Sequence, residues 1–270
     1  MKSSLTVQML ILLGMLAGWS FGQDVTRVKI AQGEYSVSTD EDLGVGPIET
    51  EVFHFRESWT LWHTPDGNYE VDGERTFESP RDIVHQNRFW AQLTRDLRLV
   101  KVKEFAKLRW RPDSGPLTCD LRPHEMRCNS GGKDPVKSIN IQVTTHQPYG
   151  IIWPISVFSL GSLAYVAAEH EGELVPVELV TFKELNEALP VLTIQSSGSI
   201  RYLGRSEVKF TASGTSWYPR MFELTSSRTR TLHIWTSHEG LVLAIERADW
   251  PKTTLRLVSF QQFAEFPRGD

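Results

Sequence analysis

The C-terminal third of the chain alternates apolar and polar side chains with a period of two residues, and this pattern constrains the fold more than any other feature. Polar segments rich in Gly and Ser, such as Ser213-Gly214-Thr215, separate the alternating runs. The runs cover residues 199–203, 207–212, 217–225, 230–236, 241–247 and 253–260. Strands that begin about every ten residues are typical of an antiparallel meander in a barrel or sandwich. The sequence therefore predicts a mainly β protein.

The N-terminal half has the same period, less regularly. Residues 47–63 and 68–77 alternate on either side of the turn Thr64-Pro65-Asp66-Gly67, which predicts an antiparallel hairpin. In the first run, Glu57 lies as a charged exception on an otherwise apolar face. The apolar residues of that face are Phe53, Phe55, Trp59 and Leu61. A third run, 97–110, changes face near residues 103–105, where we expect a β-bulge.

Helix signals are few. Ser79-Pro80-Arg81-Asp82 offers an N-cap, a proline at the first helical position and an acidic first turn. Residues 181–189 have capping-box spacing and end before Pro190. The nearly apolar segment 151–168 contains Pro154, a glycine and three serines, so we expect a buried helix begun by Pro154 rather than a membrane span.

These patterns predict a single domain over residues 23–270. No low-complexity tract, alignable repeat or linker rich in Pro, Gly and Ser divides the chain, although its length alone would also allow two small domains. The predicted fold is all-β in the main: a strongly curved antiparallel meander sheet or open barrel, with two or three short helices packed on it.

The first residues have the pattern of a secretory signal peptide. Lys2 precedes an apolar segment, and small residues lie before Gln23, where we expect cleavage. Removal of residues 1–22 would give a secreted or periplasmic protein. A short N-terminal membrane helix is the alternative, but the apolar segment is short for a span. Trp19 stands where a lipoprotein would carry its acylated cysteine after Leu16-Ala17-Gly18, so we predict no lipid anchor.

The net charge argues against two classes of partner. It is −4 for the whole chain, and loss of Lys2 with the signal peptide would make it −5, because residues 1–22 contain no other charge. Nucleic acids and anionic membranes select a concentrated positive surface. We therefore predict no nucleic-acid partner and no stable membrane anchor.

The two cysteines support the predicted compartment. Cys119 and Cys128 flank Arg122-Pro123-His124-Glu125, which we interpret as the turn between two short strands. An even number of cysteines in an exported chain predicts a disulfide, and closing so small a loop stabilises the fold by about 2.5–3 kcal/mol in the chain-entropy model. A redox pair is the alternative, but it would favour Cys-x-x-Cys at a helix start.

The segment 231–247, T-L-H-I-W-T-S-H-E-G-L-V-L-A-I-E-R, combines two histidines with an apolar run. Leu232, Ile234 and Thr236 share one face of the first predicted strand, and His233 and Trp235 share the other. Residues 237–240 then form a hairpin loop in which Gly240 adopts a positive φ. His238 and Glu239 lie at the solvated tip of this loop. We interpret the segment as a hairpin rather than a metal or catalytic site.

No other motif indicates catalysis, a metal or a cofactor. The pairs His124-Glu125, His170-Glu171 and His238-Glu239 lack the second histidine of a zinc-protease helix. A Gly-x-Ser-x-Gly elbow is absent. Ser206 and Lys209 have Ser-x-x-Lys spacing, but on a strand they would face opposite sides. We therefore predict no enzymatic activity, with an unrecognised hydrolase as the alternative, and neither metal nor cofactor.

Aromatic content stands out, with eight tryptophans after the signal peptide. Trp59 and Trp62 must face opposite sides of a sheet, so one of them is either covered or exposed for binding. Packing in the core and rim is the plainer interpretation. The functional alternative is an apolar cavity on the concave face, for which the candidate ligand-binding residues are Phe53, Phe55, Trp59, Leu61 and Trp235.

For Trp235, packing in the core and exposure in a cavity predict different losses of stability when the ring is removed. On a packed face, Trp235→Ala would cost about 3–5 kcal/mol, and on an open face less than about 1 kcal/mol. The neighbouring apolar strand favours the packed face.

A resemblance extends these expectations. The runs I-R-Y-L-G-R-S-E-V, Y-P-R-M-F-E-L, L-H-I-W-T-S-H-E-G-L-V-L-A-I-E-R and T-L-R-L-V-S-F resemble the tail of a family of exported bacterial proteins of unknown function. Such proteins are similar in shape to periplasmic lipoprotein carriers, which bend an antiparallel sheet around helices. The resemblance is a strand pattern confined to the C-terminal part, and it implies no functional residue here.

Two functions follow as hypotheses. The first is a non-enzymatic exported protein of the cell envelope or periplasm that binds a lipid or another apolar or amphipathic ligand on the concave face of its sheet. The second is a structural or protein-interaction module of the envelope whose interior is filled by its own side chains.

Overall fold

Strands make up most of the part of the chain that the computed structural model describes. That part comprises residues 27–39, 54–78, 84–106, 117–130, 139–153, 156–183, 192–227, 231–247 and 253–266. The elements are β1 (Val28–Thr39), β2 (His54–His63), β3 (Tyr69–Glu78), β4 (Val84–Leu93), β5 (Leu99–Ala106), β6 (Leu117–Arg122), β7 (Glu125–Ser130), β8 (Ile139–Thr144), β9 (Tyr149–Trp153), α2 (Ser156–Ala168), β10 (Leu174–Lys183), β11 (Leu192–Arg205), β12 (Phe210–Ala212), β13 (Thr215–Trp217), β14 (Arg220–Ser226), β15 (Leu232–Thr236), β16 (Val242–Arg247) and β17 (Thr253–Gln262).

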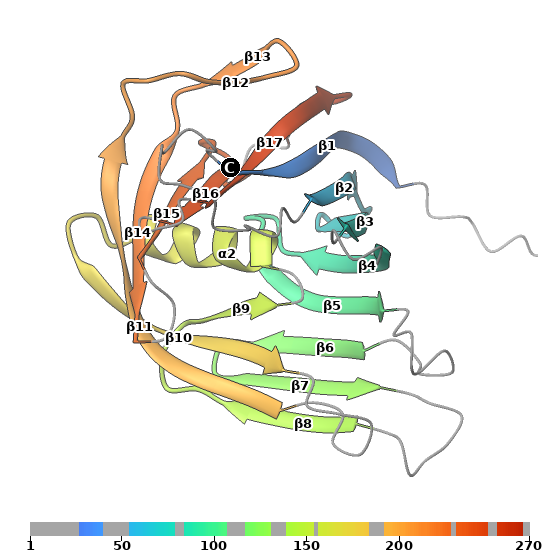
Figure 1. Cartoon of the computed structure of the whole chain (residues 1–270), viewed down its shortest axis with the longest axis vertical. Helices are drawn as coiled ribbons and strands as arrows, with labels where there is room; N and C mark the ends of the chain where they lie inside the picture. The colour runs from blue at the N-terminus through green and yellow to red at the C-terminus, as the bar shows by residue number, and fades with distance from the viewer. Residues whose placement is uncertain are drawn as a thin grey trace, which may run out of the picture.

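Two meanders join to form one large sheet. Its fifteen strands lie in the order β8-β7-β6-β5-β4-β3-β2-β1-β17-β16-β15-β14-β11-β10-β9. The first and last strands of the chain pair with each other, antiparallel, and β9 and β10 are parallel. Figure 1 shows the sheet curling around α2, while β12 and β13 form a separate hairpin at one end. The sheet has two free edges, β8 and β9, so the barrel is open.

The mainly β, strongly curved sheet is confirmed, but the predicted number of helices is wrong, because α2 is the single helix in the described residues. Residues 79–83 lie outside these residues, and Val84 already begins β4. The segment 181–183 ends β10, and 184–191 are not described. In the predicted helix 151–168, residues 151–153 belong to β9 and the helix begins at Ser156. At 181–183 the local capping signal lost to strand pairing with β11.

The predicted hairpins are confirmed in their described parts, and the predicted bulge is wrong. Strands β2 and β3 pair from His54–Glu78 to His63–Tyr69 without a shift. Residues 47–53 lie outside the described residues. The irregularity of β5 lies at its start, where Leu93 pairs with Leu99 and Gln92 with Lys101. Residues 103–105 pair regularly with β4. The alternation of apolar and charged residues therefore changes face in β5 without a bulge at these positions.

Aromatic rings and glycines alternate across the inner face of the sheet. From β17 to β4 the row of directly paired residues is Phe260, Gly33, Trp59, Gly73 and Phe89. A Cβ atom at Gly33 would lie 2.6 Å from the Trp59 ring, and one at Gly73 would lie 2.1 Å from the Phe89 ring. Each ring therefore lies across a strand where only glycine leaves room.

The helix α2 covers this row and completes hydrogen bonds that the strands leave open. Phe158 of α2 contacts Trp59 edge-on, with ring centroids 6.1 Å apart. The hydroxyl of Ser159 accepts a hydrogen bond from Ile151 N on the edge strand β9, at 2.6 Å. The hydroxyl of Ser162 accepts one from Leu99 N at the irregular start of β5, at 2.8 Å. The serines of this apolar segment thus satisfy buried backbone donors.

The predicted disulfide is present in the structure. Cys119 on β6 and Cys128 on β7 are directly paired, are bonded to each other and are both buried. The turn between them consists of Pro123 and His124, as β6 ends at Arg122 and β7 begins at Glu125. A disulfide of this kind is consistent with an oxidising compartment outside the cytosol.

Candidate functional site

A cavity of about 710 Å³ lies at one end of the sheet. Its wall is assembled from the start of β3, the β4–β5 turn, α2, β13, the β15–β16 turn, β17 and the segment after β17. The residues that line it are Tyr69, Arg95, Asp96, Leu97, Tyr165, Trp217, Ser237, His238, Glu239, Leu241, Phe260, Gln262, Glu265 and Phe266. This volume is within the range of small-molecule sites, about 300–1,000 Å³.

The cavity has an apolar base and a charged rim. The buried lining residues are Tyr69, Ser237, Leu241 and Phe260. The exposed ones are Arg95, His238, Glu239, Gln262 and Glu265. Such a gradient suits a ligand with an apolar part and a polar or charged end.

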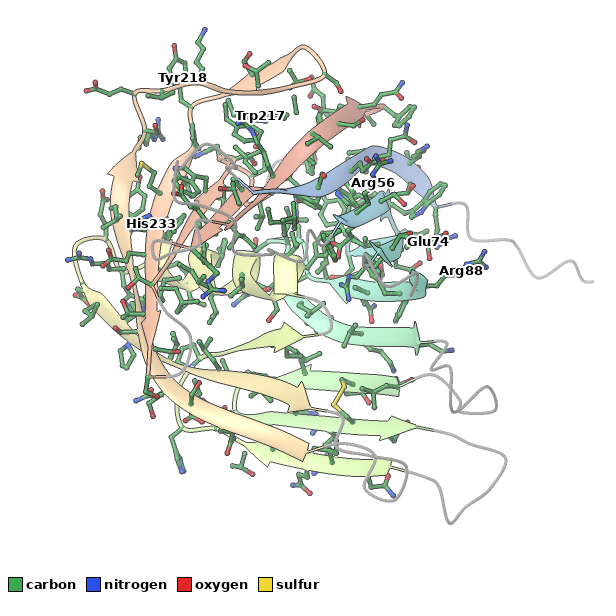
Figure 2. All side chains as sticks on the ribbon, in the orientation of Figure 1. Arg56, Glu74, Arg88, Trp217, Tyr218 and His233 are labelled. Carbon is green, nitrogen blue, oxygen red and sulfur yellow. A yellow bond between two sulfur atoms is a disulfide. The ribbon has the colours of Figure 1, made fainter. Side chains whose placement is uncertain are left out.

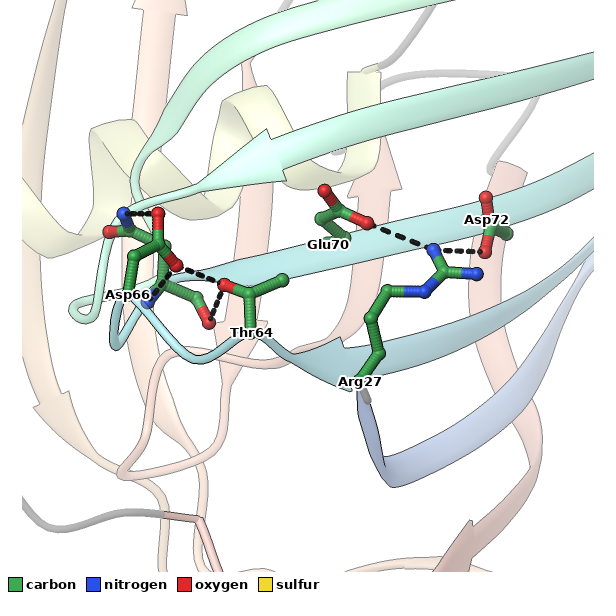
Figure 3. A network of polar contacts seen from close by, with 6 residues as sticks. Arg27, Thr64, Asp66, Glu70 and Asp72 are labelled. Atoms are coloured by element: carbon green, nitrogen blue, oxygen red, sulfur yellow. Dashed lines mark hydrogen bonds and ion pairs between the residues drawn. The ribbon is translucent and has the colours of Figure 1, made fainter. Parts of the chain in front are cut away.

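The β2–β3 turn places Tyr69 at the base. The Thr64 hydroxyl lies within hydrogen-bond distance of both Asp66 and the Asn68 carbonyl, which share its single hydrogen (Figure 3). Asn68 donates to Asp66 through its backbone amide and its side-chain amide. These bonds fix the turn directly before Tyr69. Strand alternation then turns Tyr69 inward and the next residue, Glu70, outward, where Glu70 binds Arg27 at 2.9 Å.

Tyr69 supplies a neutral hydroxyl group to the cavity. Burial raises the pKa of Tyr69 to about 12, against the opposing effect of Arg95, so the phenol stays protonated at ordinary pH. Only 1% of this residue is exposed, and its ring packs on Phe266. A protonated phenol adds no charge to the base of the cavity.

The β15–β16 turn supplies His238 and Glu239. Ser237 closes the turn, since Ser237 N donates to Leu241 O at 2.7 Å and its hydroxyl accepts from Leu241 N. Gly240 has the predicted positive φ, 95°. Arg220 on β14 approaches His238 Nδ1 at 2.6 Å. A guanidinium group can only donate, so Nδ1 accepts and the imidazole in this arrangement is neutral, with its hydrogen on Nε2.

The β4–β5 turn is strained where it meets the cavity. Leu97 has a positive φ of 58°, which is unfavourable for a residue with a branched side chain. Leu97 N donates to Thr94 O at 2.9 Å and holds this conformation. Its side chain lies beside Gly240, 3.9 Å from where a Cβ would be. The β4–β5 and β15–β16 turns therefore lie side by side at the cavity.

The β12–β13 hairpin forms one wall. Trp217 contacts Phe260 of β17 edge-on, with ring centroids 5.1 Å apart, and Phe260 N donates to the Ser213 hydroxyl. Figure 2 shows Trp217 directed from the hairpin toward the sheet and Tyr218 directed away from it. In agreement, Tyr218 is 58% exposed and Trp217 is half-buried.

A second, much smaller cavity lies deeper, between α2 and the sheet. Its volume is about 20 Å³, and it is lined by Trp59, Leu61, Leu93, Leu97, Phe158, Gly161, Gly240, Leu241 and Val242. Leu97 and Leu241 line both cavities. The smaller one has room for about one water molecule, so of these two cavities only the larger has room for a longer ligand.

The structure separates the predicted ligand-binding residues. Trp59 and Leu61 are buried at 3% and 2% exposure and line only the smaller cavity. Phe55 is half-buried on β2 and lines neither of the two cavities. Phe53 lies outside the described residues. Their binding role stays a prediction, and the structure brings together only Trp59 and Leu61.

For Trp235, the expectation of a packed face stays a prediction, since the ring is half-buried and packs against the hydrophobic core. Ile234 and Thr236 are buried, whereas Trp235 is half-buried on the opposite face, edge-on to His233 at 5.9 Å between ring centroids. Trp235 lines neither described cavity. The curved sheet packs α2 on the side of Ile234, which the alternation within one strand could not reveal.

The interpretation of 231–247 as a hairpin is confirmed. The sequence did not reveal that the tip of this hairpin borders the larger cavity. His238 and Glu239 are exposed as expected, and they also belong to the rim of the larger cavity. The turn residues of the β4–β5 connection and Glu265 were not recognised at all. No periodic signal marks them, because residues from six separate segments of the chain meet only in the folded protein.

A search of the described residues finds no group of three potential metal ligands. Within the same residues, no helix is long and apolar enough to cross a membrane. The lining of the larger cavity likewise includes no serine hydrogen-bonded to a histidine.

A buried ion pair is the other polar cluster on the concave side. Glu57, the predicted exception on β2, binds Arg75 of β3 through Arg75 Nε, and both residues are almost completely buried. The Arg75 guanidinium lies 4.7 Å from the centroid of the Phe89 ring. Burial, together with the charge of Glu57, raises the pKa of Tyr35 well above its usual value. Because the pair is enclosed by strands and rings, we assign it a structural role.

Comparisons with known proteins show the fold and no more. No family model and no curated protein match the chain. Among solved structures, it is similar to a β-barrel-like protein of a domain of unknown function, DUF1849, from Brucella abortus. The TM-score is 0.53 at 8% sequence identity, over 88% of this chain and 99% of the other. The barrel-like part of the predicted resemblance is thus confirmed, while export and likeness to lipoprotein carriers stay predictions.

Proposed function

We propose that this protein is a non-enzymatic, exported protein of the cell envelope or periplasm that binds an amphipathic ligand in the larger cavity. The observation that carries the proposal is the cavity itself: about 710 Å³, with buried Tyr69, Leu241 and Phe260 at the base and charged side chains at the rim. An apolar chain placed at the base would remove its own surface and that of the rings from water, which favours binding by about 25 cal/mol per Å².

The architecture supports this assignment. The helix α2 packs on the concave side of the sheet, and the larger cavity at the end of the sheet is lined in large part by the β4–β5 and β15–β16 turns and the segment after β17. Turns can vary in sequence without loss of the sheet, as is usual for binding sites on a rigid scaffold. Export is supported by the predicted signal peptide and by the Cys119–Cys128 disulfide.

The alternative is a structural or interaction module with no small ligand. Native mass spectrometry of the protein purified without detergent separates the two functions. A co-purified mass that is released by organic solvent supports the ligand-binding function. A clean protein mass, together with failure to bind any added amphiphile, would contradict it.

A tryptophan pair offers a matched control for the location of the ligand. Trp217 and Trp235 are both half-buried, and only Trp217 lines the cavity. We expect Trp217→Ala to reduce the amount of bound amphiphile and Trp235→Ala to leave it unchanged. Equal loss in both variants would place the ligand elsewhere.

A further inference from the structure

We infer that the larger cavity prefers ligands with a positively charged headgroup, an amine or quaternary ammonium, over anionic ones. This inference rests on the proposed function, because it specifies the ligand for the same cavity. It comes from two independent properties of the lining: its aromatic rings and the balance of its charges.

Five aromatic side chains border the cavity. They are Tyr69, Tyr165, Trp217, Phe260 and Phe266. The faces of such rings carry negative electrostatic potential and attract cations within about 6 Å of the ring centroid. The chain already uses this contact nearby: the Arg98 guanidinium lies 5.4 Å from the centroid of Tyr165, and that of Arg256 lies 4.8 Å from the centroid of Phe210.

The charged lining residues are mainly acidic. Asp96, Glu239 and Glu265 are carboxylates, whereas Arg95 is the one guanidinium among the described lining residues. Asp96 forms an ion pair with Arg98, with 3.4 Å between Asp96 Oδ2 and a guanidinium nitrogen of Arg98. Glu239 and Glu265 form no ion pair within the described part of the chain. Two carboxylates at the rim are therefore available to a cation.

His238 does not offset this acidity. Its Nδ1 accepts from Arg220, so the ring in this arrangement carries no charge of its own. Arg220 keeps its positive charge but is not among the residues that line the cavity. Among the lining residues themselves, three carboxylates stand against one guanidinium beside five aromatic rings, a combination that suits ammonium groups.

The test compares amphiphiles with the same chain and different headgroups. Dodecyltrimethylammonium, dodecanoate and dodecanol are added, each below its micelle concentration, to the full-length processed protein at pH 7.4 and low salt. Tryptophan fluorescence and native mass spectrometry give the dissociation constants. We expect dodecyltrimethylammonium to bind at least about tenfold more tightly than dodecanoate, since a like charge at the rim is repelled and a cation is attracted.

The outcomes separate the preference for cationic headgroups from the proposed binding of amphipathic ligands. Equal affinities for the cation and the anion, or tighter binding of dodecanoate, would overturn the charge preference and leave the proposed function standing. If none of the three amphiphiles binds, the proposed function itself fails.

Variants locate the preference at the rim. The double variant Glu239→Gln and Glu265→Gln is expected to weaken dodecyltrimethylammonium roughly two- to tenfold, the usual range for two exposed charge contacts, and to leave dodecanol unchanged. The matched control is Asp72→Asn with Asp120→Asn, which removes the same charge from exposed sites in ion pairs away from the cavity. Equal weakening in both variants would show that only the net charge matters and would contradict the inference.

Discussion

Trp59 and Trp217 flank the same ring, Phe260, and have opposite surroundings. Trp59 lies 6.4 Å and Trp217 lies 5.1 Å from its centroid. Trp59 sits in register between Gly33 and Gly73 and beneath Phe158 of α2, so it is enclosed on every side. Trp217 belongs to a hairpin outside the main sheet, and one side of its ring borders the large cavity. The same residue type is thus core or binding wall according to whether another element covers it.

The largest expected effect comes from removing the covered ring. Trp59→Ala should lower the free energy of unfolding by about 3–5 kcal/mol, because it leaves a cavity that glycines on both sides cannot fill. Trp217→Ala should cost less than about 2 kcal/mol, since its ring already borders open space. Urea unfolding of both variants measures the difference. Equal costs would break the distinction between the two regions.

The buried ion pair beside the covered region should be nearly as sensitive. Glu57→Ala leaves the Arg75 guanidinium in the core without its carboxylate, and we expect a loss of about 3–5 kcal/mol. The double variant Glu57→Leu with Arg75→Met should recover most of this loss, since apolar residues replace both charges. Thermal and urea unfolding check both values. If the double variant is as unstable as the single one, packing rather than charge explains the cost.

Alkaline pH should affect the cavity base through Tyr69. Its pKa is raised by burial to about 12 in the folded protein, against about 10 in an unfolded chain. Above pH 10 the unfolded state has therefore lost a proton that the folded state keeps, so stability falls as the pH rises from 10 to 12. Urea unfolding at pH 8 and pH 11 should show a smaller fall in Tyr69→Phe than in the wild type. Some fall should remain in Tyr69→Phe, because the pKa of Tyr149 is also raised to about 12 by burial and its ionisation also lowers stability in this pH range. A fall identical to that of the wild type would mean that Tyr69 ionises freely in the folded state.

The smallest effect is expected at Trp235. This ring is half-buried on the face opposite Ile234, so Trp235→Ala should cost about 1 kcal/mol or less. The midpoint of urea unfolding measures it. A cost near that of Trp59→Ala would support the packed-face interpretation of Trp235 and would remove Trp235 as a neutral control.

Much of the fold could be predicted because strand alternation is local. Residues 54–63 and 69–78 form a hairpin because their side chains alternate and a strong turn connects them, and Cys119 and Cys128 pair because two residues suffice to turn the chain between them. The helix predictions at 79–82 and 181–189 relied on caps of one turn. Such caps contribute about 1 kcal/mol each, and at 181–183 this is less than the strand gains from pairing with β11, a neighbour that the local sequence does not reveal. Residues 79–83 and 184–191 lie outside the described residues.

The amino-acid sequence by itself determined that this protein is a curved, mainly β structure with a disulfide hairpin and a glycine turn at Gly240, because these features depend on residues close together in the chain. Only the tertiary structure decided which aromatic rings are covered and where the cavity lies. Tyr69, Leu97, Trp217, Glu239 and Glu265 come from distant segments, and the sheet has to curl and pair its first strand with its last before they meet. Burial and electrostatic potential depend on that assembly, so no local pattern records them.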